Sequence, residues 1–334
     1  MDEVRARSVA ANAEMCAHYV GNYPSVEARR LDLGDEGQTV RLLQEVSPLV
    51  AFNSATMFPY SYYTPLAKRR IAELGLPSYY PGHTLAKDLV LIHKLMRAVK
   101  SAGVPVKVVN VSFPDNTHPV LGKVGLSPTV GSGNVDNLAM NVRKLAAGKL
   151  GVPAHNLTVT LISHHAVSQS WVNPAEVPYY LRIRMGETDL TKRFDSNALI
   201  IEGNNLPVDD QQMAAISSVR EIISILENRG EIIHGAGVNG IPGCVTARLD
   251  SRGAEVVLPD DLSMDQVLEM NSVGMRFDGI QHIEDDGTVE FTEPAAEFLR
   301  QALGLEWTKM KLSQAEDMAR DLAEAYNRLK EKYS

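Results

Sequence analysis

With 334 residues, 44% hydrophobic and 22% charged, the chain is long enough for two domains, which we expect at 1–150 and 151–334. The net charge of −8 and the absence of a basic stripe exclude a nucleic-acid surface, and apolar runs such as 106–111 are too short to cross a membrane. Cys16 and Cys244 are far apart and the first residues do not resemble a signal peptide, so we expect reduced thiols and a cytoplasmic protein.

Helical and strand-like patterns alternate through the first 112 residues. In chain order we expect a helix at 4–19, a strand at 26–33, a helix at 36–46, a strand at 48–53, a helix at 85–101 that Gly103 ends, and a strand at 104–112. The second and third strands are almost entirely apolar, which is typical of strands buried on both faces. The alternation predicts an α/β fold, with a parallel Rossmann-type sheet followed by a mixed α+β substrate domain.

Polar side chains follow the two buried strands. Asn53 and Ser54 come at the end of the first, and Asn110 and Ser112 at the end of the second. Open parallel sheets bind ligands beyond the carboxyl ends of their strands. We therefore take these four residues, together with Gly131 in a later glycine-rich turn, as candidates for binding a nucleotide cofactor; ordinary turns are the alternative.

A glycine-rich phosphate loop of the form G-x-G-x-x-G does not occur near the N-terminus. In a dinucleotide-binding domain this loop follows the first strand and opens the next helix. Gly131-Ser132-Gly133 and Gly235-Ala236-Gly237 contain fragments of the spacing, but they lie too late in the chain. We therefore expect the Rossmann sheet to be incomplete and the chain as given to bind NAD weakly or not at all.

Four motifs follow one another between residues 108 and 171. They are Val111-Ser112-Phe113-Pro114, Val130-Gly131-Ser132-Gly133, Lys149-Leu150-Gly151-Val152 and Ser163-His164-His165-Ala166. With a later Leu249-Asp250-Ser251-Arg252-Gly253, their order and spacing resemble the lactate/malate dehydrogenase superfamily, which also includes the family 4 glycosidases. The resemblance covers about 230 residues. It implies NAD or NADP as cofactor, a small-molecule substrate and a homo-oligomer.

The first residues fit the same resemblance. Met1-Asp2-Glu3 is similar to the tail of the second strand in this superfamily. The resemblance therefore implies that roughly 30 residues, carrying the first strand and the glycine loop, are absent.

The resemblance places the acid/base group of the reaction on His165. Histidine suits that role because its pKa lies near the working pH. His164 stands where the family has a glutamate, and we include it among the catalytic candidates. The family orients its histidine with an aspartate on the helix after the glycine turn. Asp136 is the nearest match, and Asn137 is the alternative because this helix is one residue longer.

The arginines of the family have no clear counterpart. An apolar residue stands where the helix arginine would bind a substrate carboxylate, and Phe113 replaces an asparagine that binds substrate or nicotinamide ribose. Arg69 and Arg70, in a long loop expected at 58–84, are candidates for the arginine of a mobile loop; solvated charges are the alternative. We therefore expect a secondary alcohol or 2-oxo compound other than lactate or malate bound in the usual way.

A divalent-metal site of the kind that family 4 glycosidases use is the competing interpretation. It would combine His164, His165 and His118 with Asp115 or Cys244. Adjacent side chains of a strand point to opposite faces, so we expect His164 and His165 not to share an ion and predict no metal. Three hypotheses result: an NAD(P)-dependent oxidoreductase, an NAD- and metal-dependent hydrolase, and a non-catalytic remnant of the fold.

The last 50 or so residues follow another pattern. Asp285-Asp286-Gly287 predicts a turn between two short strands, and helices are expected at 293–303 and 313–333. The last helix would begin with a capping box of Ser313 and Glu316. Its apolar stripe needs a partner, either its own domain or another subunit.

Overall fold

The computed structural model describes residues 3–76, 78–169 and 172–333. Met1 and Asp2, and Trp171 at the end of the segment that carries the resemblance, lie outside these residues. The helices are α1 (Glu3–Tyr19), α2 (Glu36–Val46), α3 (Tyr60–Leu74), α4 (Leu85–Ala102), α5 (Pro114–Lys123), α6 (Asn134–Leu150), α7 (Ser196–Asn204), α8 (Asp210–Leu226), α9 (Met264–Phe277), α10 (Glu293–Phe298) and α11 (Ala315–Tyr333). Among the described residues, no helix combines the length and the apolar character needed to span a membrane.

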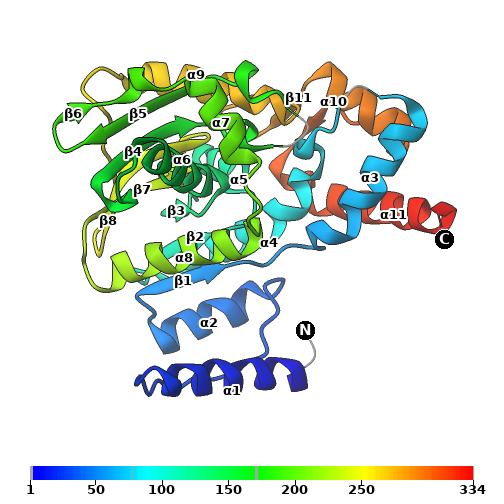
Figure 1. Ribbon diagram of the computed structural model, residues 1–334. Coiled ribbons are helices and arrows are strands. Elements are labelled where there is room, and N and C mark those ends of the chain that lie inside the picture. The colour runs from blue at the N-terminus through cyan, green and yellow to red at the C-terminus, as the bar shows by residue number, and fades with distance from the viewer. Residues whose placement is uncertain (1–2, 77, 170–171, 334) are drawn as a thin grey trace.

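A sheet of nine described strands lies at the centre of the molecule (Figure 1). Its members are β1 (Val50–Asn53), β2 (Lys107–Asn110), β3 (Val130–Gly131), β4 (Leu157–Ser163), β5 (Tyr179–Met185), β6 (Thr188–Asp189), β7 (Glu231–Ala236), β8 (Cys244–Asp250) and β9 (Gly253–Val256). The order is β1-β2-β3-β7-β8-β4-β5-β6, with β9 beside β8. The first three strands pair in parallel and the later pairs are antiparallel. The predicted α/β fold is therefore confirmed.

The parallel strands bring the cofactor candidates together. Asn53 lies opposite Asn110, and Asn110 lies opposite Gly131. Val108 and Val109 of β2 are buried, as expected, but Phe52 of β1 is 45% exposed, so the expectation that the strand at 48–53 is buried on both faces is wrong. All three candidates stand at the carboxyl edge, where open sheets bind ligands.

The C-terminal part of the chain covers α4. β10 (Ile280–Ile283), β11 (Val289–Phe291) and β12 (Lys309–Met310) form a small antiparallel sheet, with the predicted turn between the first two. α11 packs on α4 and α3 and buries Leu322 and Tyr326. The apolar stripe of the last helix therefore has its partner within the same chain.

Of the six elements predicted in the first half, five are present and one is wrong. The helices expected at 36–46 and 85–101 are α2 and α4, and Gly103 ends α4 with a positive φ of 67°. The strand expected at 26–33 is absent: residues 22–32 form no helix or strand. No residue of 26–33 is buried, and no described strand pairs with it, so its alternating pattern has no sheet to join.

Two further local expectations are corrected. The segment 58–84 is not a long loop, because α3 and a short 3-10 helix, Pro81–Thr84, occupy most of it. The capping box at Ser313 is also wrong. A 3-10 turn, Leu312–Gln314, precedes α11, and Glu316 forms an ion pair with Lys94 at 2.8 Å instead.

Candidate active site

His165 lies just beyond the carboxyl end of β4. The strand ends at Ser163, and a 3-10 turn begins at His165. Both His164 and His165 are buried, and their ring centroids are 4.8 Å apart. The expectation that these neighbours point to opposite faces is therefore wrong, because the strand does not continue through them.

Asp278 faces both histidines from the C-terminal end of α9. Its Oδ2 is 2.5 Å from Nε2 of His165 and 3.7 Å from Nε2 of His164. Nδ2 of Asn116 donates to the same oxygen at 2.5 Å. Asp278 is fully buried, and its Oδ1 has no hydrogen-bond partner among the described residues. Two histidines and an amide, from two other elements of the chain, thus meet at the carboxylate of Asp278.

The charges of this cluster set its protonation. Burial alone would lower the pKa of His165, but the charges of Asp278 and Asp115 and the hydrogen bond to Asp278 outweigh it and raise the pKa to about 9. Burial, with the charge of His165, lowers the pKa of His164 to about 4. Burial would raise the pKa of Asp278, but the two histidines lower it below its usual range. At neutral pH the site therefore holds an imidazolium–carboxylate pair beside a neutral imidazole.

The second ring nitrogen of His165 faces the side chain of Gln169. Nδ1 is 2.9 Å from the amide of Gln169, which is only partly buried. Because an imidazolium donates from both nitrogens, the amide must turn its oxygen toward Nδ1 when His165 is protonated. The ring of Phe113 packs edge-on against His165, with 5.3 Å between centroids. Nδ1 is thus the ring nitrogen of His165 that faces away from Asp278.

The same cluster has the dimensions of a metal site. One donor atom from each of His164, His165 and Asp278 lies within 4.8 Å of the others. The backbone N–H of Ala166, however, donates to Nδ1 of His164 at 3.3 Å, so this nitrogen carries the lone pair. Neutral His164 then has its proton on Nε2, the nitrogen that faces Asp278, and a protonated nitrogen does not bind a metal. The hydrogen bonds favour a proton-bridged pair over a metal centre.

Among the described residues, the other expected metal ligands do not belong to this group of donor atoms. Nδ1 of His118 is 2.9 Å from the carbonyl oxygen of Gly237, and burial lowers its pKa to about 4. Cys244 is buried, and burial raises the pKa of its thiol. Asp115 accepts the backbone N–H of His165 at 3.2 Å.

Asp136 is not brought to His165. Its Oδ1 is 3.1 Å from Nδ1 of His234, and Ser217 donates to its Oδ2 at 2.8 Å. The carboxylate that faces His165 is Asp278 instead. The register of α6 explains the difference, because the side chain of Asp136 is directed toward α8 and β7.

The surroundings of Asn137 differ from those of its neighbour Asp136. It lines a small polar cleft with Asn141 and Ser168, and its Nδ2 has no hydrogen-bond partner among the described residues. Ser168 donates to the carbonyl oxygen of His165 at 2.7 Å, so this cleft adjoins the turn that carries the histidine. Asn137, the alternative weighed for this helix, is therefore the one placed near an opening.

Most of the cofactor candidates bond to their own neighbours. Nδ2 of Asn53 donates to Oδ1 of Asn110 at 2.8 Å, and Nδ2 of Asn110 is 3.0 Å from Nε2 of His118. Ser112 donates to the carbonyl oxygen of Ala55 at 2.8 Å. The Asn53 amide thus bonds to Asn110, and the Asn110 amide is surrounded by neighbouring polar groups.

Gly131 and Ser54 complete the set. A Cβ on Gly131 would come within 2.1 Å of Cβ of Pro114, so glycine is needed there for the approach of α5. Ser54 is exposed. Four of the five candidates are thus committed to internal contacts, and the residues present do not fit the pyrophosphate of a dinucleotide.

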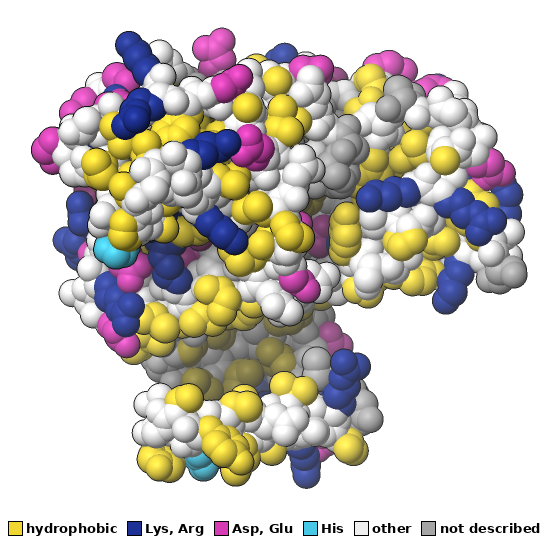
Figure 2. Space-filling model, viewed as in Figure 1, with side chains coloured by type: hydrophobic (Ala, Val, Ile, Leu, Met, Phe, Trp, Pro, Cys, Tyr) yellow, Lys and Arg dark blue, Asp and Glu magenta, His cyan; other side chains and the backbone are white. Residues whose placement is uncertain are grey.

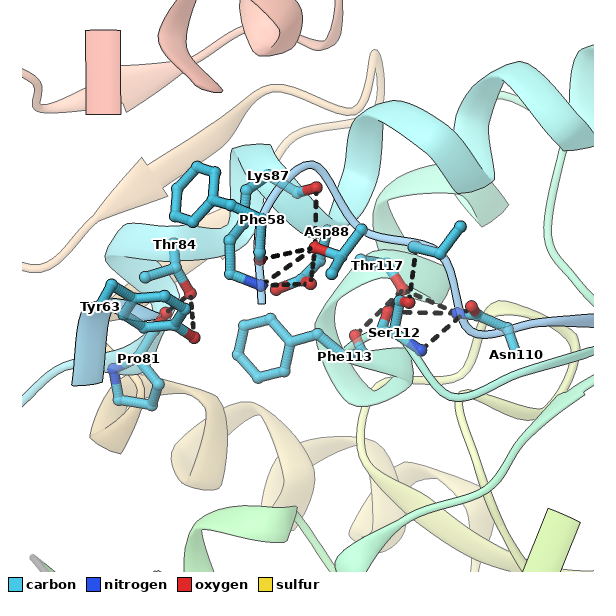
Figure 3. Close-up of polar contacts among 12 residues, drawn as sticks. Phe58, Tyr63, Pro81, Thr84, Lys87, Asp88, Asn110, Ser112, Phe113 and Thr117 are labelled. Carbon is cyan, nitrogen blue, oxygen red and sulfur yellow. Dashed lines mark hydrogen bonds and ion pairs between the residues drawn. The ribbon is translucent and has the colours of Figure 1, made fainter. Parts of the chain in front are cut away.

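A buried cation that no sequence motif indicated, Lys87, lies at this edge of the sheet. Nζ of Lys87 donates to Asp88 at 2.6 Å and to Thr56 at 3.1 Å. It also lies over the rings of Tyr63 and Phe58, 5.1 and 5.8 Å from their centroids. Figure 3 shows this ion pair beside Phe113, with Ser112 and Asn110 farther to the right in the view. Lys87 thus places a buried positive charge near the sheet edge at which a ligand was expected.

The two expected arginines, Arg69 and Arg70, lie on α3, beside the C-terminal part of the chain. The guanidinium of Arg69 stacks on Tyr333, 4.0 Å from the ring centroid. Arg70 pairs with Glu73 at 2.8 Å. Both positions belong to α3 rather than to a loop, and the helix directs them toward the C-terminal part of the chain, where neither contacts His165.

Comparison with known proteins supports the fold alone. No protein-family model and no curated protein matches the sequence. The minor L-lactate dehydrogenase of Enterococcus mundtii in its ligands-bound form aligns with a TM-score of 0.55 at 16% identity, over 83% of this chain and 85% of that one. The malate dehydrogenase of Picrophilus torridus gives 0.54 at 15% identity, over 82% and 84%. The malate dehydrogenase of Plasmodium falciparum in complex with NADH gives 0.50 at 12%, over 94% and 87%.

Proposed function

We propose that this chain, which has the fold of lactate and malate dehydrogenases, is an oxidoreductase that acts on a secondary alcohol or 2-oxo compound with His165 as its acid/base group. The observation that carries the proposal is the buried pair of His165 and Asp278, joined at 2.5 Å. Interconversion of an alcohol and a carbonyl moves a hydride at carbon and a proton at oxygen. A histidine held by a carboxylate supplies the proton.

The two nitrogens of His165 have different tasks in this proposal. Nε2 stays bonded to Asp278, which holds the ring and stabilises its charged form. Nδ1 donates to the carbonyl oxygen during reduction, after that oxygen has displaced Gln169. In the oxidation direction Nδ1 accepts the hydroxyl proton. Since the pKa of His165 is about 9, the ring is charged at neutral pH and poised for reduction.

NAD or NADP is the hydride partner that the proposal names, and a malate dehydrogenase of this fold binds NADH. The residues at the ends of β1, β2 and β3 do not fit the phosphates, because they bond to one another. We therefore assign the cofactor no contacts. We expect weak NADH binding by the chain as given, and calorimetry that gave a micromolar Kd would contradict this expectation.

Turnover over a panel of secondary alcohols and 2-oxo acids, with each nicotinamide cofactor, tests the proposal. His165→Gln and Asp278→Asn should each lower kcat by about 100-fold or more, the size of a general acid/base contribution. His155→Gln is the matched control, because His155 is exposed. A wild-type protein that turns over no compound and binds no NADH at millimolar concentration would refute the proposal and support a non-catalytic protein.

A metal-dependent hydrolase is the second candidate, because His164, His165 and Asp278 offer three donor atoms within 4.8 Å. The two functions make opposite predictions about metal. An oxidoreductase with a proton-bridged pair keeps its turnover in EDTA and contains no stoichiometric metal by elemental analysis. A hydrolase loses its turnover in EDTA and regains it with one divalent ion per chain.

A further inference from the structure

A small polar cleft lies between α6, α7 and α8, beside the turn that carries His165. The described residues that line it include Asn137, Asn141, Ser168, Asn204 and Asp210. Its volume is about 30 Å³, which is room for one or two groups of the size of water. The cleft is therefore suited to one small polar part of a ligand rather than to a whole cofactor.

Asn137 brings an unused donor to this cleft. The residue is 4% exposed, and its Nδ2 has no hydrogen-bond partner among the described residues. Buried polar groups are nearly always hydrogen-bonded, because an unpaired one keeps the full cost of its removal from water. The amide of Asn137 thus lacks an acceptor that a ligand in the cleft would supply.

Two other amides of the lining offer acceptors. Nδ2 of Asn141 donates to the carbonyl oxygen of Gly203 at 3.1 Å, and Nδ2 of Asn204 donates to that of Val167 at 2.8 Å. The Oδ1 atom of an amide points away from its NH₂ group, so these bonds leave the two Oδ1 atoms as acceptors. A donor and acceptors thus line the same small space.

The cleft carries no positive charge among its described lining residues. Its charged member is Asp210, which is exposed. The positive end of the α6 dipole lies near the cleft, but the first turn of that helix already contains Asp136. Figure 2 draws the face that carries α7 and α8, and its Lys and Arg side chains are scattered rather than gathered into a basic patch. A carboxylate or phosphate would therefore find no counter-charge here.

A hydroxyl group matches this set of donors and acceptors. It can accept a hydrogen bond from Asn137 and donate one to Asn141 or Asn204. A carboxylate only accepts, and an ammonium group only donates, so each would leave part of the lining unpaired. The hydroxyl is also small enough for the space.

We propose that the cleft binds a hydroxyl group of an uncharged polyol, or of its hydroxy ketone, and that these compounds are the substrates of His165. The inference rests on the proposed function. The cleft and the histidine share the turn His165–Ser168, in which Ser168 donates to the carbonyl oxygen of His165 at 2.7 Å. Reduction of dihydroxyacetone would move a hydride from NADH to the carbonyl carbon and a proton from Nδ1 of His165 to the carbonyl oxygen. The products are glycerol and the oxidised cofactor.

NMR of the side-chain amides tests binding without turnover. The Asn137 signals, assigned by their loss in Asn137→Leu, should shift saturably with millimolar glycerol. Lactate has the same number of non-hydrogen atoms and should leave them in place. Asn156→Leu is the matched control, because Asn156 is exposed and lies at the other end of β4 from His165, and this variant should keep the glycerol shift. His165→Gln should keep it as well.

Kinetics at millimolar NADH test the substrate class. The wild type should reduce dihydroxyacetone with a kcat/KM at least 10-fold above that for pyruvate, and Asn137→Leu should raise the KM for dihydroxyacetone by about 10-fold, the loss of roughly one hydrogen bond, with little change in kcat. Unchanged circular dichroism would show that the variant folds. Lactate shifts as large as those of glycerol, no glycerol shift at all, or a KM that Asn137→Leu leaves unchanged would each overturn the proposal. A glycerol shift without turnover of any compound would support the cleft as a polyol site and refute the proposed function alone.

Discussion

Nε2 of His165 lies 2.5 Å from Oδ2 of Asp278, although the two residues are 113 positions apart in the chain. One follows a strand and the other ends a helix, and both are buried. A carboxylate at the C-terminal end of a helix opposes the helix dipole, so its placement there has to be compensated. The charge of His165 supplies that compensation.

Asp278→Asn should destabilise the protein at neutral pH. The amide keeps the shape of the side chain but leaves a buried imidazole without its counter-charge, a change that typically costs about 3–5 kcal/mol. Urea unfolding at pH 7 measures this loss. Asp285→Asn, which removes an exposed partner of Lys123, should leave the midpoint almost unchanged. Equal midpoints for the wild type and Asp278→Asn would show that the pair does not contribute.

Stability should depend on pH through His165. Its pKa is raised in the folded state to about 9, against about 6.5 in an unfolded chain. The stabilisation is therefore fully present below about pH 6.5 and is lost as pH rises toward 9. Unfolding free energies of the wild type minus those of His165→Gln should fall across this interval. A difference that rises with pH would contradict the charged pair.

Glu221→Gln should stabilise the protein at pH 8 and remove a second pH dependence. Burial raises the pKa of Glu221 to about 8, so the folded state binds a proton that the unfolded state has lost above about pH 4.5. Stability then falls as pH rises from 4.5 to 8, by roughly 1.4 kcal/mol for each unit of pKa difference. Thermal melts of the variant should show a shallower pH profile over this range. A variant less stable than the wild type at pH 8 would mean that Glu221 is charged and paired.

Asp136→Asn should weaken the fold without changing the protonation of His165. Its partners are His234 and Ser217, and burial of its charge is offset by His234, which lowers the pKa of Asp136. A histidine NMR spectrum of the variant should keep the His165 signal and its titration. A shift of the His165 pKa by a unit or more would restore Asp136 to the site.

The sequence allowed the fold class to be predicted and indicated His165 as a candidate, but it did not indicate which carboxylate faces His165. Hydrophobic spacing indicates α4 and the apolar strands. The ordered motifs around His165 indicate that residue as a candidate. Asp278 carries no motif, and its approach to His165 depends on how α9 packs beside β4. Asp136 and Asn137 illustrate the same limit: neighbours on a helix differ by about 100° around its axis, so one residue of register decides which of them lines the cleft beside the turn of His165.

The charge of His165 is the central premise of the proposed function, and an NMR titration of the His165 ring measures that charge directly. With the His165→Gln spectrum as assignment, the wild-type ring should titrate near pH 9, and in Asp278→Asn the midpoint should fall by more than a unit. A wild-type midpoint at or below about 6.5 would contradict the account, because the ring would then be neutral at the pH at which it is proposed to donate its proton.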